Sequence, residues 1–167
     1  MQSMALKINV SRADQEAINH VLEKAGYTPQ KRKFHCTIGF IEKMIPEEES
    51  VAFGQKITLL LQDTITPLQP LYEVDKAVHL FGHVIAFLPT AKALAQLQEM
   101  NIWLFDKVKE ISGGRWELNE ETQSQAYIPH LTLWRSRRPD RRLQKLAQVA
   151  ETHPSYHLSE AAYVIFN

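Results

Sequence analysis

Two copies of one short pattern, one in each half of the chain, constrain the fold more than any other feature of the sequence. The first is HCTI at residues 35–38, within FHCTIGF, and the second is HLTL at residues 130–133, within PHLTLW. Side chains in a β-strand point alternately to the two faces of the sheet, so a histidine and a threonine two residues apart share a face. Each copy therefore predicts a strand that presents an imidazole and a hydroxyl together, with its apolar residues turned to the other face.

The order of the remaining elements suggests that the two halves build similar lobes. Period-two alternation predicts strands, apolar residues spaced three to four apart predict helices, and Ser11 and Gly82 are expected as an N-cap and a hairpin turn. Strands mixed with helices around a near-duplicated motif are typical of an α+β fold, in which the two motif strands could face one cleft. The strands are expected at 5–10, 34–41, 71–81, 83–88, 128–135 and 156–166, the helices at 12–24, 46–61, 89–111 and 139–150, and a loop at 115–127.

Composition and charge exclude several classes of protein. The 167 residues carry 19 basic and 19 acidic side chains and no formal net charge, which argues against a protein that coats long nucleic acids but permits a small anion or an RNA end as ligand. Cys36 is the single cysteine, so neither an intramolecular disulfide nor a zinc site of several thiolates can form. Without a long apolar run or a signal-peptide layout, we expect a cytoplasmic protein with no membrane partner.

The side chains shared by the two motifs fit the chemistry of phosphodiester cleavage. Histidine titrates near pH 6.5, so at neutral pH one imidazole can act as a base while a second, protonated one acts as an acid. Threonine hydroxyls can donate hydrogen bonds to the non-bridging oxygens of a phosphate as charge builds on them. The sequence therefore predicts metal-independent cleavage by His35 and His130 with Thr37 and Thr132 holding the phosphate, although it does not say which histidine is the acid.

At these motifs the chain resembles the 2H phosphoesterase superfamily, which is named for two His-x-Thr/Ser-x motifs. It looks most similar to the bacterial RNA 2′,3′-cyclic phosphodiesterases, also called 2′-5′ RNA ligases. The resemblance implies a single domain over residues 1–167, made of two intertwined, pseudo-symmetric lobes of antiparallel sheet, with helices packed outside and a central cleft. It also implies that His35 and His130 are the catalytic pair, that Thr37 and Thr132 bind the phosphate, and that no metal or cofactor is needed.

Five further residues are candidates for binding the substrate. Trp134 shares strand parity with His130 and could stack on a base, or it could be packing. Lys33 could meet the phosphate or lie at a solvated strand end, and Tyr127 could offer its hydroxyl. Arg137 and Arg138 belong to a basic run directly after the second motif, which could guide a polyanion or form a solvated loop.

Three functions remain open at this point. The first is hydrolysis of the 2′,3′-cyclic phosphate of RNA 3′ ends or small nucleotides, with a reverse 2′-5′ ligase activity through the same site. The second is cleavage of 2′-5′-linked or cyclic oligonucleotide signals by the same four residues. The third is an RNA-binding module with a vestigial site, against which the intact histidines and threonines of both motifs argue. We expect a monomer.

Overall fold

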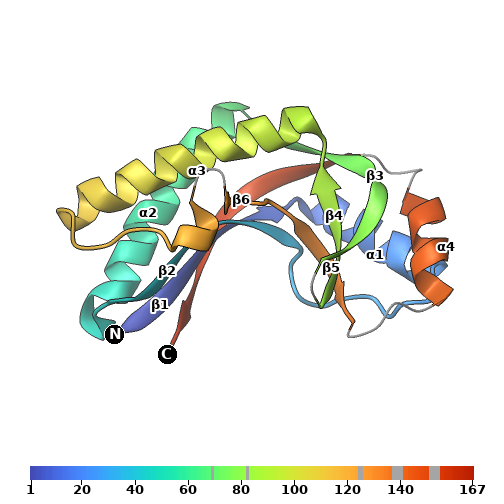
Figure 1. The fold of residues 1–167 in the computed structure, drawn as a ribbon, viewed down its shortest axis with the longest axis horizontal. Helices are drawn as coiled ribbons and strands as arrows, with labels where there is room; N and C mark the ends of the chain where they lie inside the picture. Colours follow the sequence, from blue (N-terminus) through green and yellow to red (C-terminus); the bar gives the residue numbers. More distant parts are fainter. Residues whose placement is uncertain (69, 82, 124–125, 137–140, 151–154) are drawn as a thin grey trace.

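The computed structural model describes residues 1–167 except 69, 82, 124–125, 137–140 and 151–154, and it shows an α+β fold with helices outside an antiparallel sheet (Figure 1). The expected turn residue Gly82 thus lies outside the described residues. The elements follow the expected order closely. They are β1 (Gln2–Val10), α1 (Arg12–Lys24), β2 (His35–Ile45), α2 (Glu47–Leu68), β3 (Leu71–Phe81), β4 (Val84–Pro89), α3 (Ala91–Ser112), the short 3₁₀ helix η1 (Glu120–Thr122), β5 (Leu131–Arg135), α4 (Arg141–Ala150) and β6 (Ser155–Phe166).

The six strands of the described residues form two groups of three antiparallel strands, and the outer strands of one group pair with those of the other. Around the closed sheet the order is β1-β2-β5-β4-β3-β6, and every pairing is antiparallel. The halves of the chain exchange their last strands, because β6 joins β1 and β2 whereas β3 joins β4 and β5. The two lobes expected from the duplicated motif are therefore each completed by a strand from the other half of the chain. Figure 1 shows α2 and α3 over the lobe of β1, β2 and β6, and α1 and α4 beside the other lobe.

The helix boundaries follow local signals, with two departures from expectation. Ser11 caps α1 as predicted, since its side chain accepts a hydrogen bond from the backbone N–H of Asp14. The α2 helix continues beyond residue 61 to Leu68 with Pro67 inside it, because a proline in the last turn disrupts few backbone hydrogen bonds. The expected loop at 115–127 contains η1. Within the described residues, no helix combines the length and the apolar character needed to span a bilayer.

Alternation on β1 and β2 separates the core from the face that carries the motif. Leu6 and Ile8 of β1 are buried, as are Cys36 and Ile38 of β2, whereas the residues between them are partly exposed. A β-bulge interrupts β2 at Ile38, since Leu6 pairs with Gly39 and the next residue of β1 already pairs with Thr37. Bulges re-aim side chains next to functional sites, and this one changes which later residues of β2 share the face of Thr37.

Candidate active site

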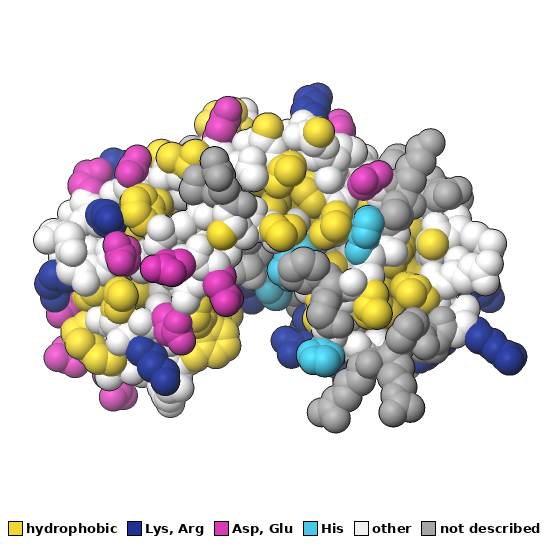
Figure 2. Space-filling model, in the orientation of Figure 1, with side chains coloured by type: hydrophobic (Ala, Val, Ile, Leu, Met, Phe, Trp, Pro, Cys, Tyr) yellow, Lys and Arg dark blue, Asp and Glu magenta, His cyan; other side chains and the backbone are white. Residues whose placement is uncertain are grey.

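The two motif strands meet at a narrow seam between the lobes. In the described part of the chain, β2 and β5 are paired at one position, Cys36 with Leu131. Because that pair is antiparallel, the residues on either side of it stand opposite each other, so His35 faces Thr132 and Thr37 faces His130. Cys36 and Leu131 are buried on the core side, which turns all four flanking side chains to the other face. Figure 2 shows a notch at this waist of the molecule, with histidine side chains beside it.

Both imidazoles are anchored in the same way. The Nδ1 atom of His35 lies 3.1 Å from the carbonyl oxygen of Lys33, and Nδ1 of His130 lies 3.0 Å from the carbonyl oxygen of Ile128. A carbonyl oxygen can only accept a hydrogen bond, so each Nδ1 carries the hydrogen that it donates. When the ring is neutral, its lone pair is therefore on Nε2. The motif thus fixes each tautomer through the residue two positions before the histidine.

The surroundings of His35 favour its neutral form. Burial is the largest cause, and together with the positive charges of Lys7, Arg32 and His130 it lowers the pKa of His35 to about 4, against the opposing effect of the hydrogen bond to the Lys33 carbonyl. At neutral pH the Nε2 atom of His35 is consequently able to accept a proton.

Lys7 extends the motif face onto a third strand, and the sequence analysis did not single it out. It pairs with Thr37 across β1 and β2, so the two side chains lie on one face. Burial lowers the pKa of Lys7, as do the neighbouring charges of Lys33 and Arg32. Among the described residues no carboxylate pairs with Lys7 or Arg32, whereas Lys33 is paired with Glu160 at 2.6 Å. Half-buried cations crowded together in this way are a binding feature for an anion.

A signal for Lys7 was present in the sequence. It is the one charged residue of its strand, with Leu6 and Ile8 on either side. Alternation alone places it opposite the core, but nothing local indicates which strand lies beside it. Asn9, the next residue on the same face, pairs with His35 and donates from Nδ2 to Glu160 at 3.1 Å.

Cys36 and Tyr127 form the buried layer beneath the motif face. Cys36 is fully buried, and burial raises its pKa to about 12, so the thiol stays protonated and is no nucleophile. The Tyr127 hydroxyl donates to the carbonyl oxygen of Thr37 at 2.8 Å and lies 3.7 Å from Cys36 Sγ. The hydroxyl that was expected to reach the substrate is therefore engaged inside the protein, where it links the segment before motif 2 to motif 1.

A pocket of about 590 Å³ opens directly from one side of the seam. Thr37 and His130 line it, whereas His35 and Thr132 do not. Phe40 lines it together with Thr37, although the two are three residues apart, because the bulge at Ile38 restores a shared face. The other lining residues are Ala5, Glu42, Asn119, Glu121, Thr122, Ala126, Tyr127, Ile128 and Phe166.

The remaining candidates lie around the other end of the seam or outside the described residues. Trp134 packs against Tyr27, with 5.2 Å between ring centroids, and does not line the pocket. Lys33 contributes its carbonyl to His35 while its ammonium group is held by Glu160. Arg137 and Arg138 lie outside the described residues.

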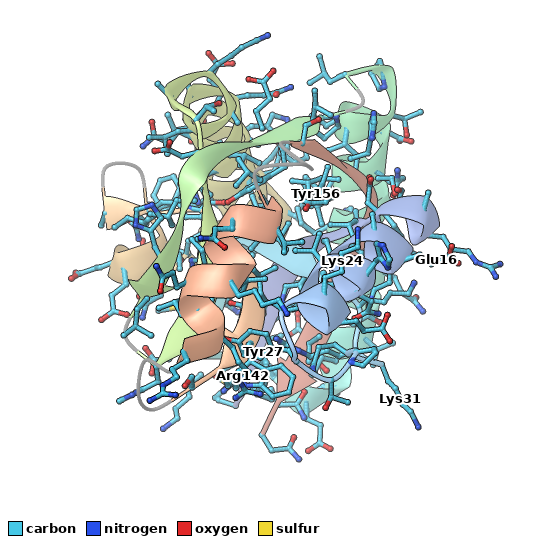
Figure 3. All side chains as sticks on the ribbon, turned by 90° about the vertical axis from the view of Figure 1, so that its right-hand side faces the viewer. Glu16, Lys24, Tyr27, Lys31, Arg142 and Tyr156 are labelled. Carbon is cyan, nitrogen blue, oxygen red and sulfur yellow. The ribbon has the colours of Figure 1, made fainter. Side chains whose placement is uncertain are left out.

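Arg142, from the same basic run, has a structural contact. Its guanidinium lies 4.3 Å from the centre of the Tyr27 ring and joins α4 to the end of α1, as Figure 3 shows. One member of the run therefore stabilises packing between two helices.

The assembled groups suit acid–base chemistry on a phosphate. Two imidazoles with defined tautomers and two threonines lie on one face, next to two half-buried cations without carboxylate partners among the described residues. Across the described ranges, no group of three or more His, Cys, Asp and Glu side chains is placed to hold a metal ion.

Comparisons with known proteins give likenesses of architecture only. No family model matches the sequence, and no curated protein matches it. Among solved structures, Kluyveromyces marxianus Usb1 with uridine monophosphate is similar at 10% identity and a TM-score of 0.47, over 99% of this chain and 97% of that one. The MHV ns2 PDE domain is similar at 11% identity and a TM-score of 0.46, over 99% and 90%. The function must therefore be inferred from the residues of this chain.

Proposed function

We propose that this protein is a phosphodiesterase of the 2H type, which opens the 2′,3′-cyclic phosphate of RNA 3′ ends or small nucleotides without a metal ion. One observation carries the proposal. The Cys36–Leu131 pair sets two His-x-Thr motifs head to tail, so that a phosphate on this face would have an imidazole and a hydroxyl on each side. The matching anchors on the two Nδ1 atoms support it.

In the proposed reaction His35 is the base, because its lowered pKa favours the neutral form, and the second motif histidine is the acid. His35, neutral at its Nε2 atom, removes a proton from a water molecule, whose oxygen forms a bond to phosphorus. The bond from phosphorus to one ribose oxygen breaks, and His130 donates a proton to that oxygen. The product is a phosphate monoester with a free hydroxyl on the neighbouring ribose carbon, and both histidines return to their first state by exchange with solvent. Ligation would run the same steps in reverse.

Residues on three strands stabilise the negative charge that develops on the phosphate. Thr37 and Thr132 donate hydroxyl hydrogen bonds to the non-bridging oxygens. Lys7 and Arg32, beside them, supply positive charge that no carboxylate neutralises among the described residues. Their half-buried position strengthens this attraction relative to water.

Turnover of 2′,3′-cyclic mononucleotides in the presence of EDTA tests the proposal. We expect the wild type to be active and His35→Ala and His130→Ala each to lose 100-fold or more in kcat, roughly the value of a general acid or base. His20→Ala is the matched control, because His20 is exposed on α1. Full activity in either motif variant, or activity that EDTA abolishes and zinc or manganese restores, contradicts the proposal.

A substrate panel separates the related functions. It consists of a 2′,3′-cyclic mononucleotide, an RNA with a cyclic end, a 2′-5′ oligoadenylate and a cyclic dinucleotide. We expect turnover of the first two. Turnover of only the last two would assign the site to oligonucleotide signals, and RNA affinity without any turnover would indicate a binding module.

A further inference from the structure

The pocket beside the seam differs in chemistry from the rest of the site. It is lined by Thr37 and His130 together with apolar side chains, carboxylates and an amide. Neither half-buried cation lines the pocket: Lys7 and Arg32 are both absent from its walls, and Arg32 donates to the carbonyl of Thr132 at 3.4 Å. The pocket must therefore suit a part of the substrate other than a phosphate.

One wall is apolar and open to solvent. The rings of Phe40 and Phe166 meet edge to face, with 6.1 Å between centroids. Phe166 is 46% exposed and Ile128, across the pocket, is 50% exposed. Large apolar side chains that remain exposed around a hollow are a signature of ligand binding, and an aromatic wall suits a planar ring.

The other wall presents a fixed carboxylate. Asn119 donates from Nδ2 to Glu42 Oε2 at 2.8 Å. Asn119 is itself held, because its backbone N–H donates to the Phe40 carbonyl at 2.6 Å and its Oδ1 accepts from the backbone N–H of Glu121 at 2.8 Å. The second oxygen of Glu42 has no partner among the described residues and is free to accept a hydrogen bond from a ligand.

The charge of the pocket disfavours a second phosphate in addition to the one at Thr37 and His130. Glu42 and Glu121 both line the pocket, and Figure 2 shows carboxylates gathered on the lobe of α2 and α3. A second phosphate would be repelled here and attracted toward Lys7 and Arg32 instead. An uncharged aromatic ring that presents N–H groups would pack on the apolar side chains and donate hydrogen bonds to the carboxylates.

We infer that this pocket is a nucleobase subsite, in which Phe40 and Phe166 contact the base and Glu42 accepts hydrogen bonds from its edge, so that guanine is preferred to uracil. The inference rests on the proposed function, which puts the phosphate of the same nucleotide against Thr37 and His130. Guanine has two adjacent donors, N1–H and the N2 amino group, that match a carboxylate. Uracil has one N–H between two carbonyl oxygens, which a carboxylate repels.

Binding of nucleoside 3′-monophosphates, measured by calorimetry, tests the subsite without turnover. We expect the wild type to bind guanosine 3′-monophosphate about tenfold more tightly than uridine 3′-monophosphate, the lower end of the range for one bidentate base contact. Glu42→Gln should bind the two equally, because the amide replaces one acceptor by a donor. Glu48→Gln, an exposed carboxylate on α2 outside the pocket, is the matched control and should keep the preference.

A second variant tests the aromatic residues of the pocket separately. Phe166→Leu keeps an apolar side chain at an exposed position, so it should fold, and it should weaken both nucleotides severalfold through loss of the ring contact. Equal wild-type affinity for the two bases, or an unchanged preference in Glu42→Gln, would overturn the subsite. If the preference is found but no cyclic phosphate is cleaved, the proposed reaction fails and the subsite stands.

Discussion

The hydroxyl of Tyr127 and the main-chain carbonyl of Thr37 are joined by a 2.8 Å hydrogen bond beneath the seam between the lobes. The chain reaches His130 three residues after Tyr127, so this bond ties the approach to motif 2 to the strand of motif 1. Both groups are shielded from water, because Tyr127 is buried. The contact therefore ties the backbone of motif 1 to the segment that leads into motif 2, and we expect it to help hold the two imidazoles at their spacing.

Tyr127→Phe should consequently affect both stability and catalysis. Loss of the hydroxyl leaves the Thr37 carbonyl without this donor, which should lower the free energy of unfolding by about 1–2 kcal/mol. For a positioning residue, kcat should fall while KM changes little. Urea unfolding and steady-state kinetics measure the two effects. Tyr163→Phe is the control, since no hydrogen bond of the Tyr163 hydroxyl is seen among the described residues; equal kinetic loss in both variants would refute the positioning role.

Lys7→Met should separate activity from stability. The substitution removes a half-buried charge that lies beside Lys33 and Arg32, so we expect the free energy of unfolding to stay the same or to rise. We expect kcat/KM to fall about 10- to 100-fold, the value of a hydrogen bond to a charged group. Lys56→Met on the exposed part of α2 is the matched control. Loss of stability without loss of activity would show that Lys7 is structural.

Cys36 should be inert in the folded protein. Its thiol is fully buried and its pKa is raised to about 12, so almost no thiolate forms at neutral pH. We expect no reaction with a thiol reagent such as DTNB until the protein is unfolded, and Cys36→Ala should keep most of the activity. Rapid labelling of the native protein that abolishes activity would reopen a cysteine mechanism.

Local signals in the sequence were sufficient for much of the fold. Alternation located both motif strands, and the Ser11 cap gave the start of α1. The four motif residues were predicted from the duplicated pattern, from strand parity, from the chemistry of imidazole and hydroxyl groups, and from the resemblance to the 2H phosphoesterases. Strand alternation predicts which face a side chain lies on, but it does not predict which residue of a neighbouring strand lies opposite, because strand pairing depends on the whole chain.

The residues that were missed show this limit. Lys7 belongs to the site only because β1 pairs with β2 at Thr37, and Phe40 faces the pocket only because a bulge adds a residue at Ile38. Tyr127 was only a candidate for substrate binding, because the sequence does not show whether a hydroxyl in a loop points outward or, as here, donates to a carbonyl inside the protein. Each case required a contact between segments that are distant in sequence.

The surroundings of His35 also predict where activity is lost in acid. Its pKa of about 4 in the free enzyme should place the acid limb of kcat/KM near pH 4 rather than near 6.5. Because the charge of Lys7 contributes to the lowering, Lys7→Met should move this limb to higher pH. Rate measurements from pH 3.5 to 8 with a cyclic mononucleotide test both expectations. A limb near 6.5 in the wild type would show that His35 is not the base.

The same lowered pKa links folding to pH. Between pH 6.5 and 4 the unfolded chain binds a proton at residue 35 that the folded protein does not, so stability falls as the pH falls through this window. The loss should be on the order of 2 kcal/mol by pH 4.5, since each pKa unit is worth 1.36 kcal/mol and His35 is partly exposed to solvent. His35→Gln cannot bind this proton, and urea unfolding should show it losing less stability than the wild type between pH 7 and pH 4.5. His20→Gln, at an exposed position on α1, should behave as the wild type does. Identical acid losses in His35→Gln and the wild type would mean that His35 is protonated as readily in the folded protein as in the unfolded chain.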